Sequence, residues 1–179
     1  MRIKKLNLGC GNKYRDDCIN CDYSKNVKAD YYFNLEKDTF PFSSNEFDFI
    51  YIVHTLGHIK NVDSCMSEIY RVLKPNGYLI VIESYYKSDN AYSDLTRHHF
   101  FTCRTLDHFI KDTDLGKNHN FYYNFKYSKK HIKLYMLNSN KKLMVDNLLT
   151  FLANLNNRFF DIFLSKLFPV NEIYFKLKK

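Results

Sequence analysis

Two glycines and an acidic residue near the start of the chain have the types and spacing of a nucleoside-binding site. An apolar segment, 3–8, leads directly into Gly9 and Gly11, and Asp22 closes the next apolar segment. Glycine at the end of a strand allows a sharp turn and a close approach of a ligand to the backbone, and an acid on the next strand can hydrogen-bond ribose hydroxyls. A dinucleotide fingerprint also needs a third glycine, but Tyr14 stands at that position, which argues against a nicotinamide cofactor.

Four histidines are candidates for a general base, because imidazole titrates near neutral pH. His54 and His58 follow the aromatic and β-branched segment 47–53, and His98 and His99 lie in a polar segment after the next apolar one. Each also has a purely structural interpretation, as a residue that packs against a helix start or anchors a loop.

The thiols do not predict a metal site. Five cysteines form an odd, scattered set, which suits a reducing compartment better than a disulfide framework: Cys10, Cys18, Cys21, Cys65 and Cys103. With Cys10, the pair Cys18-x-x-Cys21 offers three thiols, but no convincing fourth ligand follows at zinc-ribbon spacing. We therefore expect neither metal nor redox chemistry at these thiols.

The strands and helices that must position these residues are predicted to form an α/β fold. Strands are predicted at 3–8, 18–22, 30–34 and 47–53, with connections too short for long crossover helices. A helix capped by Asn61 or Asp63 is predicted to run to about Leu73, and a turn at 75–77 precedes a buried strand at 78–83. This strand, helix, strand order favours a parallel crossover, with the carboxyl ends of the strands on one ligand-binding edge.

The C-terminal half is less regular. Its sequence predicts strands at 121–127 and 131–137, a helical segment at 142–167 and a final strand at 172–177. No repeat or low-complexity linker marks a boundary, so we expect one domain, 1–179.

Composition and charge narrow the function classes. The hydrophobic content is 45%, no run approaches the roughly 18 apolar residues of a membrane span, and the N-terminus enters a strand, so we predict a cytoplasmic protein without a membrane partner. The formal charge of +8 is uneven: residues 117–179 hold 12 Lys and Arg against 3 Asp and Glu, a net charge of +9. Such a basic third is typical of a polyanion-binding surface or of an ordinary lysine-solvated one.

Three blocks of sequence resemble the class I S-adenosylmethionine-dependent methyltransferases. These are Leu6 to Asn12 with Ile19 to Asp22 behind it, Asn45 to His58, and Glu68 to Ile80. The blocks follow the order of that family's motifs from residue 3 to about residue 83. The resemblance implies a Rossmann-like, mostly parallel sheet with an antiparallel C-terminal strand, S-adenosylmethionine as cofactor, a cofactor-binding core at 1–83, and a substrate loop, helical insertion and terminal strands at 84–179.

The resemblance also implies roles for the matching residues. Gly9, Cys10 and Gly11 would pass beneath the methionine and ribose part of the cofactor, with Asn7 close by. Asp22 would bind the ribose hydroxyls, Asn34 and Leu35 would flank the adenine, and His54 would lie near the sulfonium. Catalysis is expected from His54 and His99, and acceptor binding from His58, Tyr85 and His98. Three positions depart from the family pattern: Asn7 replaces an acid, Lys13 a glycine, and Gly57 a glutamate.

Three functions fit the sequence. The favoured one is an O- or N-methyltransferase acting on a small molecule or glycan, for which one base suffices because the sulfonium is already activated. The second is a nucleic-acid methyltransferase that uses the basic C-terminal third and would show steep salt dependence. The third is an inactive cofactor-binding or scaffold protein, for which the absent carboxylates at positions 7 and 57 are the argument. The acceptor and the oligomeric state stay open.

Overall fold

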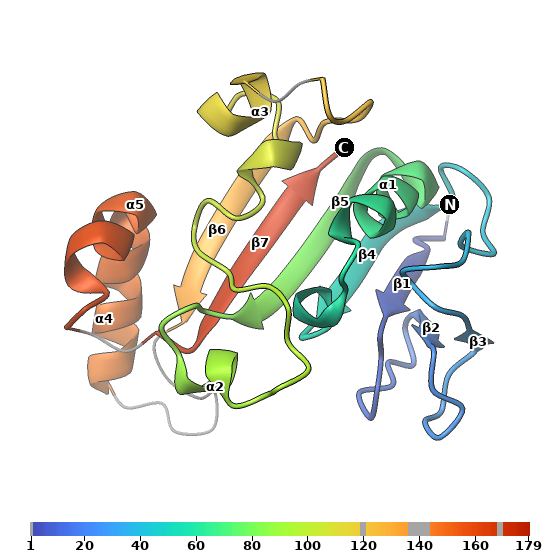
Figure 1. The fold of residues 1–179 in the computed structure, drawn as a ribbon, viewed down its shortest axis with the longest axis horizontal. Helices are drawn as coiled ribbons and strands as arrows, with labels where there is room; N and C mark the ends of the chain where they lie inside the picture. The colour runs from blue at the N-terminus through green and yellow to red at the C-terminus, as the bar shows by residue number, and fades with distance from the viewer. Residues whose placement is uncertain (1, 119–120, 136–143, 168–169) are drawn as a thin grey trace.

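The computed structural model describes residues 2–118, 121–135, 144–167 and 170–179. Its centre is a seven-stranded sheet with the order β3-β2-β1-β4-β5-β7-β6. The strands are β1 Lys5–Leu8, β2 Ile19–Asp22, β3 Tyr31–Tyr32, β4 Phe47–Val53, β5 Leu73–Ser84, β6 Lys129–Tyr135 and β7 Glu172–Lys178. The first five strands pair in parallel, and β7 lies antiparallel to both β5 and β6. The predicted α/β sheet with an antiparallel C-terminal strand is confirmed (Figure 1).

The helices are mostly short. They comprise α1 Val62–Val72, α2 Asp89–Tyr92, α3 Asp114–Asn118, α4 Met144–Leu155 and α5 Asn157–Phe159, the 3-10 turns η1 Leu56–His58 and η2 Asp107–Phe109, and the π-helical turn η3 Phe160–Leu164. The connections from β1 through β4 lie wholly within the described residues and contain no helix. The prediction that helices are trimmed in the first half is therefore confirmed.

Helix α1 forms where the sequence predicts it. Asn61 caps it, because its side-chain oxygen accepts a hydrogen bond from the Ser64 backbone N–H at 3.1 Å. Its buried stripe packs on the inner face of the sheet, whose central strands contribute six fully buried side chains: Leu6, Leu8, Ile50, Ile52, Leu79 and Val81. The helix ends at Val72, and β5 begins immediately at Leu73 instead of after the predicted turn.

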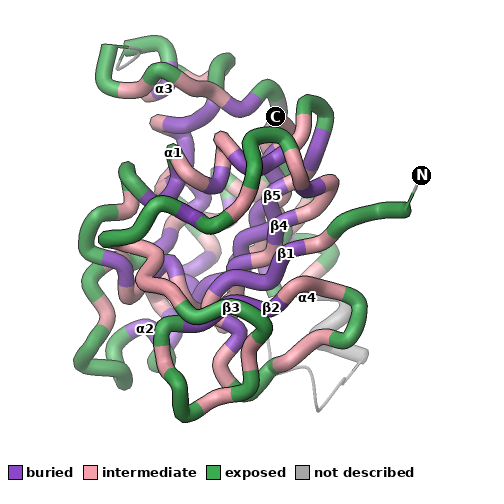
Figure 2. Tube along the Cα trace, turned by 90° about the vertical axis from the view of Figure 1, so that its right-hand side faces the viewer, coloured by how far each residue is buried: buried purple, intermediate pink, exposed green. Residues whose placement is uncertain are grey.

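The helices α1, α2 and α3 lie on one face of the sheet (Figures 1 and 2). On the opposite face, the side chains that alternate with the core are half-buried, among them Phe49, Tyr51 and Tyr78. Cations partly cover these rings: the Arg15 guanidinium lies 4.2 Å from the Tyr51 ring centre, and the Lys176 ammonium 4.1 Å from that of Tyr78. Because the connections from β1 to β4 contain no helix, none of the described residues forms a helix over β1 and β4 from these connections.

Several predicted boundaries change. β1, β2 and β3 are shorter than predicted, and β3 has only two residues because it pairs with Cys21 and Asp22 alone. The strand predicted at 121–127 is wrong, since only Tyr127 makes a bridge, to Ile110. Its aromatic side chains pack against other rings instead. The ring centres of Phe125 and Tyr70, for example, lie 5.0 Å apart.

The remaining C-terminal predictions fare better. β6 and β7 confirm the predicted strands as far as they are described, since residues 136 and 137 of the first lie outside the described residues. The helical segment predicted from 142 is observed from Met144 to Leu164 with a break at Asn156, and its first two residues also lie outside the described part.

Candidate functional site

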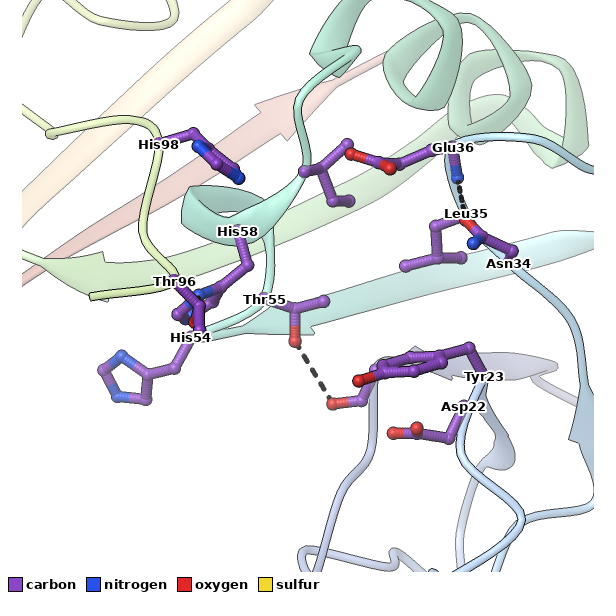
Figure 3. A pocket seen from close by; sticks show the side chains of 12 residues that line it. Asp22, Tyr23, Asn34, Leu35, Glu36, His54, Thr55, His58, Thr96 and His98 are labelled. Carbon is purple, nitrogen blue, oxygen red and sulfur yellow. Dashed lines mark hydrogen bonds between the residues drawn. The ribbon is translucent and has the colours of Figure 1, made fainter. Parts of the chain in front are cut away.

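A cavity of about 510 Å³ opens at the carboxyl edge of the parallel strands, within the 300 to 1,000 Å³ that small-molecule sites typically have. It lies where β1, β2, β3 and β4 end, and the loop after β5 closes one side of it. Figure 3 shows how its lining side chains converge: Gly9, Asp22, Tyr23, Asn34, Leu35, Glu36, His54, Thr55, His58, Ile59, Thr96 and His98.

The glycine turn after β1 is tied to the acid at the end of β2. Gly9 and Gly11 both have a positive φ, of 64° and 49°, a conformation that suits glycine. The Gly11 N–H donates to one carboxylate oxygen of Asp22 at 2.8 Å, and the Ser24 N–H donates to the other at 2.9 Å. An ionised carboxylate has about four acceptor sites, so both oxygens of Asp22 can still accept hydrogen bonds from a ligand.

Thr55 lies directly against Gly9. Its hydroxyl donates to the Gly9 carbonyl at 3.2 Å and is also 3.1 Å from the Val53 carbonyl (Figure 3). A Cβ atom on Gly9 would come within 2.3 Å of the Thr55 methyl carbon, whereas a Cβ on Gly11 would meet no atom within 4 Å. The two glycines therefore have different reasons to be glycine, and only the first is packed against a neighbour.

His54 stands at the end of β4 with a φ of 51°, which is uncommon for a residue with a Cβ. Its Nε2 lies 3.0 Å from a carboxylate oxygen of Glu172, at the start of β7 and 118 positions away in the chain. The hydrogen bond with His54 lowers the pKa of Glu172 below its ordinary value, against the opposing effect of burial. The antiparallel C-terminal strand thus contributes directly to the edge that holds the cavity.

A buried ion pair fixes the loop that carries Thr96 and His98. A guanidinium nitrogen of Arg97 lies 2.7 Å from a carboxylate oxygen of Glu83, and the two side chains are only 5% and 0% exposed, respectively. The other Glu83 oxygen accepts the Gly57 N–H at 3.1 Å, and the Gly57 carbonyl accepts the His98 N–H at 2.8 Å. A Cβ at position 57 would lie 2.3 Å from an Arg97 nitrogen. The departure from the family pattern at Gly57 thus has a packing reason.

The departure at Asn7 also has a structural reason. Asn7 is buried, and its amide nitrogen donates to the Lys13 carbonyl at 3.2 Å and to the Asn20 side-chain oxygen at 3.0 Å. An acid in its place would lack these donors. The Asn7 amide therefore stabilises the turn that contains Gly9 and Gly11 through its hydrogen bond to the Lys13 backbone.

The structure brings most of the predicted site residues together. Seven line the cavity: Gly9, Asp22, Asn34, Leu35, His54, His58 and His98. Asn7, Cys10 and Gly11 do not line it and support the turn beneath it instead. The thiol of Cys10 is buried, and burial raises its pKa above the ordinary value.

Tyr85 and His99 lie elsewhere. Tyr85 is fully buried and donates its hydroxyl hydrogen bond to the Asp161 carboxylate in η3, so it belongs to the core and not to the cavity wall. His99 lines a separate cavity of about 380 Å³ together with aromatic side chains including Phe100 and Phe109. His98 borders both cavities. The predicted roles of Tyr85 in acceptor binding and His99 in catalysis therefore do not follow from the geometry of the first cavity.

The sequence did not predict five of the residues that line the cavity, nor Glu172, the partner of His54. Tyr23, Glu36 and Thr55 each lie within two positions of a predicted or observed strand end, and Ile59 directly follows the predicted site residue His58, so the whole turn, and not only its motif residue, was the available signal. Thr96 pairs with His58, whose Nδ1 is 2.9 Å from the threonine hydroxyl. Neither this pairing nor that of His54 with Glu172 has a local sequence signal.

The thiols form no metal site in the described part of the chain, where no group of three or more His, Cys, Asp or Glu could hold an ion. Cys18 is half-buried, and burial raises its pKa to about 11; Cys21 is fully buried and its pKa is raised further by burial. Thiols with raised pKa values are poor nucleophiles and poor metal ligands at neutral pH.

A mostly parallel sheet with a glycine turn, an acidic β2 end and a crevice at its carboxyl edge defines a Rossmann-like cofactor-binding protein. Residues 6–81 match the family described as a methyltransferase domain. This match makes the chain similar to the S-adenosylmethionine-dependent methyltransferases, enzymes whose cofactor is S-adenosylmethionine.

The curated relatives match only part of the chain. A sterol 4-C-methyltransferase of Caenorhabditis elegans is 41% identical over 63 residues, which are 33% of this chain and 19% of that protein. A ubiquinone/menaquinone biosynthesis C-methyltransferase of Hydrogenovibrio crunogenus is 46% identical over 50 residues, 28% of this chain and 19% of that protein. The matched part of the chain thus spans about a fifth of the length of these relatives.

Solved structures extend the likeness of fold to the whole chain. A methyltransferase from Archaeoglobus fulgidus has a TM-score of 0.64 at 16% identity, covering 99% of this chain and 86% of that one. Phosphoethanolamine N-methyltransferase 2 of Haemonchus contortus, in complex with phosphomonomethylethanolamine and S-adenosylhomocysteine, has a TM-score of 0.63 at 16% identity, covering 100% of this chain and 49% of that one.

Proposed function

We propose that this chain transfers the methyl group of S-adenosylmethionine to an oxygen or nitrogen atom of a small-molecule or glycan acceptor. The observation that carries the proposal is the cavity in which Gly9, Asp22 and Asn34 face three histidines. Residues 1–83 form the cofactor-binding part of this proposal and residues 84–179 the acceptor side, in a single cytoplasmic domain.

The residues at the edge fit the cofactor. Asp22 keeps acceptor capacity for two ribose hydroxyls, and the backbone at Gly9 can be approached closely because it carries no side chain. Leu35 and Ile59 supply apolar surface for the adenine, and the Asn34 amide supplies polar contacts. The bound cofactor would supply a methyl group on a positively charged sulfur.

His54 is the general base of this proposal. A carboxylate only accepts hydrogen bonds, so the contact with Glu172 assigns the His54 proton to Nε2 and leaves Nδ1 as the acceptor. Such a nitrogen can take a proton from an acceptor hydroxyl or amine as the methyl group arrives. His58 is held by Thr96, so with His98 it belongs to the acceptor-binding side of the cavity.

A carbon acceptor is the second candidate. Two of the relatives similar over part of the chain are named C-methyltransferases, one of sterols and one of ubiquinone and menaquinone biosynthesis. A base at His54 would serve a carbon acceptor equally, because proton removal also follows or accompanies C-methylation.

The contacts of the C-terminal lysines argue against the second function, a nucleic-acid methyltransferase that uses the basic C-terminal third. Lys126 donates to two backbone carbonyls, Lys179 to two carbonyls and an asparagine, and Lys130 pairs with Asp107. Burial lowers the pKa values of Lys126 and Lys179. The cavity lining contains no lysine or arginine among the described residues, so a nucleic-acid acceptor is not favoured there.

The test is release of S-adenosylhomocysteine during incubation with a panel of phenols, amines, sugars, sterols and quinols. An acceptor from this panel should raise turnover in the parent protein, and His54→Gln should lower kcat by about 10²-fold or more with cofactor affinity unchanged. His131→Gln is the control, since His131 is an exposed histidine on β6. Equal turnover in His54→Gln would refute the base assignment, and cofactor binding without turnover on any acceptor would favour the scaffold hypothesis.

A further inference from the structure

The helical segment after β6 exposes an unusual amount of apolar surface. Seven of its large apolar side chains are between 44% and 72% exposed: Phe151, Leu152, Leu155, Phe159, Ile162, Phe163 and Leu167. Scattered exposed apolar residues are normal, but a contiguous group within one segment marks an interaction site. We call these seven residues the apolar face.

The apolar face cannot turn inward, because the other side of the segment already holds it to the protein. Ala153 and Phe160 are buried, and the Asn154 amide bonds both the N–H and the carbonyl of Leu134 at 2.9 Å. Asp161 accepts the hydrogen bond of the buried Tyr85 hydroxyl. The exposed side chains therefore point away from the body by the geometry of the attachment.

Two side chains of the apolar face, both after the break at Asn156, lie in direct contact. Phe151, Leu155, Phe159 and Phe163 recur every four residues across α4, α5 and η3. The rings of Phe159 and Phe163 have their centres 5.0 Å apart. Figure 1 places α4 and α5 beside β6, at the outer edge of the sheet.

Charge identifies the kind of partner. Residues 150–167 contain three charged side chains. Arg158 and Lys166 are exposed, whereas the only acid, Asp161, is occupied by Tyr85. Within residues 150–167 the outward charges are therefore all positive, which complements an anionic surface and opposes close contact with a second copy of the same face.

We propose that the apolar face is the docking surface for an anionic lipid bilayer, with its phenylalanine and leucine side chains entering the interface and Arg158 and Lys166 facing the headgroups. An apolar stripe flanked by cations is the pattern of helices that lie in a membrane interface. No helix among the described residues is long and apolar enough to cross a membrane, so the contact is peripheral. The sequence-based expectation of no membrane partner rested on the absence of a spanning segment and on an N-terminus that enters a strand, and neither feature bears on peripheral contact.

The inference goes beyond the proposed function and does not depend on turnover. Its structural link to the candidate site is the edge they share: Asp161 of η3 contacts Tyr85, which directly follows β5 at its carboxyl end.

The test is co-sedimentation of the full chain, without cofactor, with phosphatidylcholine vesicles and with vesicles that also contain phosphatidylserine. The parent protein should bind the phosphatidylserine vesicles, with binding that weakens as salt rises. The double change Phe159→Asp with Phe163→Asp should weaken binding at least about tenfold. Ile3→Asp is the matched control, because Ile3 is 58% exposed, like Phe163 at 60%, and precedes β1, at the amino end of the parallel strands.

Four results would overturn the proposal. One is sedimentation of the parent protein with neither kind of vesicle. Another is equal binding by the double variant and the parent. The third is a dimer in solution that the double variant converts to a monomer, which would assign the apolar face to a second copy of the chain. Loss of binding in both the double variant and Ile3→Asp would show nonspecific adsorption and would also refute it. Because the experiment uses no cofactor, none of these results bears on methyl transfer.

Discussion

Replacing Gly9 by alanine tests the packing of the glycine turn most sharply. The new Cβ would lie 2.3 Å from the Thr55 methyl carbon and 2.4 Å from its hydroxyl oxygen, and φ at this position is 64°. A left-handed backbone costs a residue with a Cβ about 1–2 kcal/mol, and overpacking costs about 1–3 kcal/mol more. The free energy of unfolding should therefore fall by about 2–5 kcal/mol in Gly9→Ala.

Gly11→Ala is the matched comparison. Its φ of 49° brings the same backbone cost, but its Cβ would meet no atom within 4 Å, so the loss should be only about 1–2 kcal/mol. Urea unfolding of both variants and of Gly9→Ala with Thr55→Ala measures the difference. The double variant should be more stable than the summed single effects by about 1 kcal/mol, since Thr55 loses its two closest atoms. Equal losses in the two glycine variants, or no coupling with Thr55, would refute the packing argument.

The remaining predictions concern charged and buried polar groups. Arg97→Met should cost about 3–5 kcal/mol of unfolding free energy, because Glu83 is left buried without its partner, and a second change, Glu83→Met, should recover most of the loss in urea titrations. Asn7→Asp should cost about 1–3 kcal/mol by the same assay, because the acid cannot donate the two hydrogen bonds of the amide; an unchanged midpoint would contradict this. The pKa of Glu172 is lower in the folded protein than the pKa of about 4.3 that a glutamate has in the unfolded chain. The ionised carboxylate therefore stabilises the fold above that pH, and this stabilisation is lost as the pH falls through the pKa of the folded state. His54→Gln should therefore flatten the rise of melting temperature between about pH 3 and pH 5.

The local signals of the sequence predicted the parts of the fold that local chemistry determines. Asn61 could be identified as a cap from its type and position, and the alternation of Ile173, Phe175 and Leu177 predicted β7. The glycine turn and Asp22 were found for the same reason, since they follow buried strands directly.

Long-range contacts had no such signal. The aromatic run near Phe125 has the composition of a strand, yet its rings are satisfied by packing on Tyr70 and Phe109 without strand pairing. Tyr85 follows a strand like the cavity residues do, but the helical segment after β6 covers it.

The ion pair of Glu83 with Arg97 shows the same limit at the site. The sequence marks Gly57 as a departure from the family pattern, and only the packing of the Arg97 side chain supplies the reason. The pairing of His54 with Glu172 depends on the register between β5 and β7, which no local pattern determines.

Thermal unfolding with and without S-adenosylmethionine tests the central claim most directly, because it needs no acceptor. Ligand at about 100 times its dissociation constant stabilises the folded state by about 2.7 kcal/mol, equivalent to about 5–10 °C for a chain of this length. We expect this rise in melting temperature for the parent protein and for Asp112→Ala, in which an exposed acid is replaced as a control. The rise should be lost in Asp22→Ala. No rise in the parent protein at millimolar ligand, or an equal rise in Asp22→Ala, would contradict the assignment of this cavity to the cofactor.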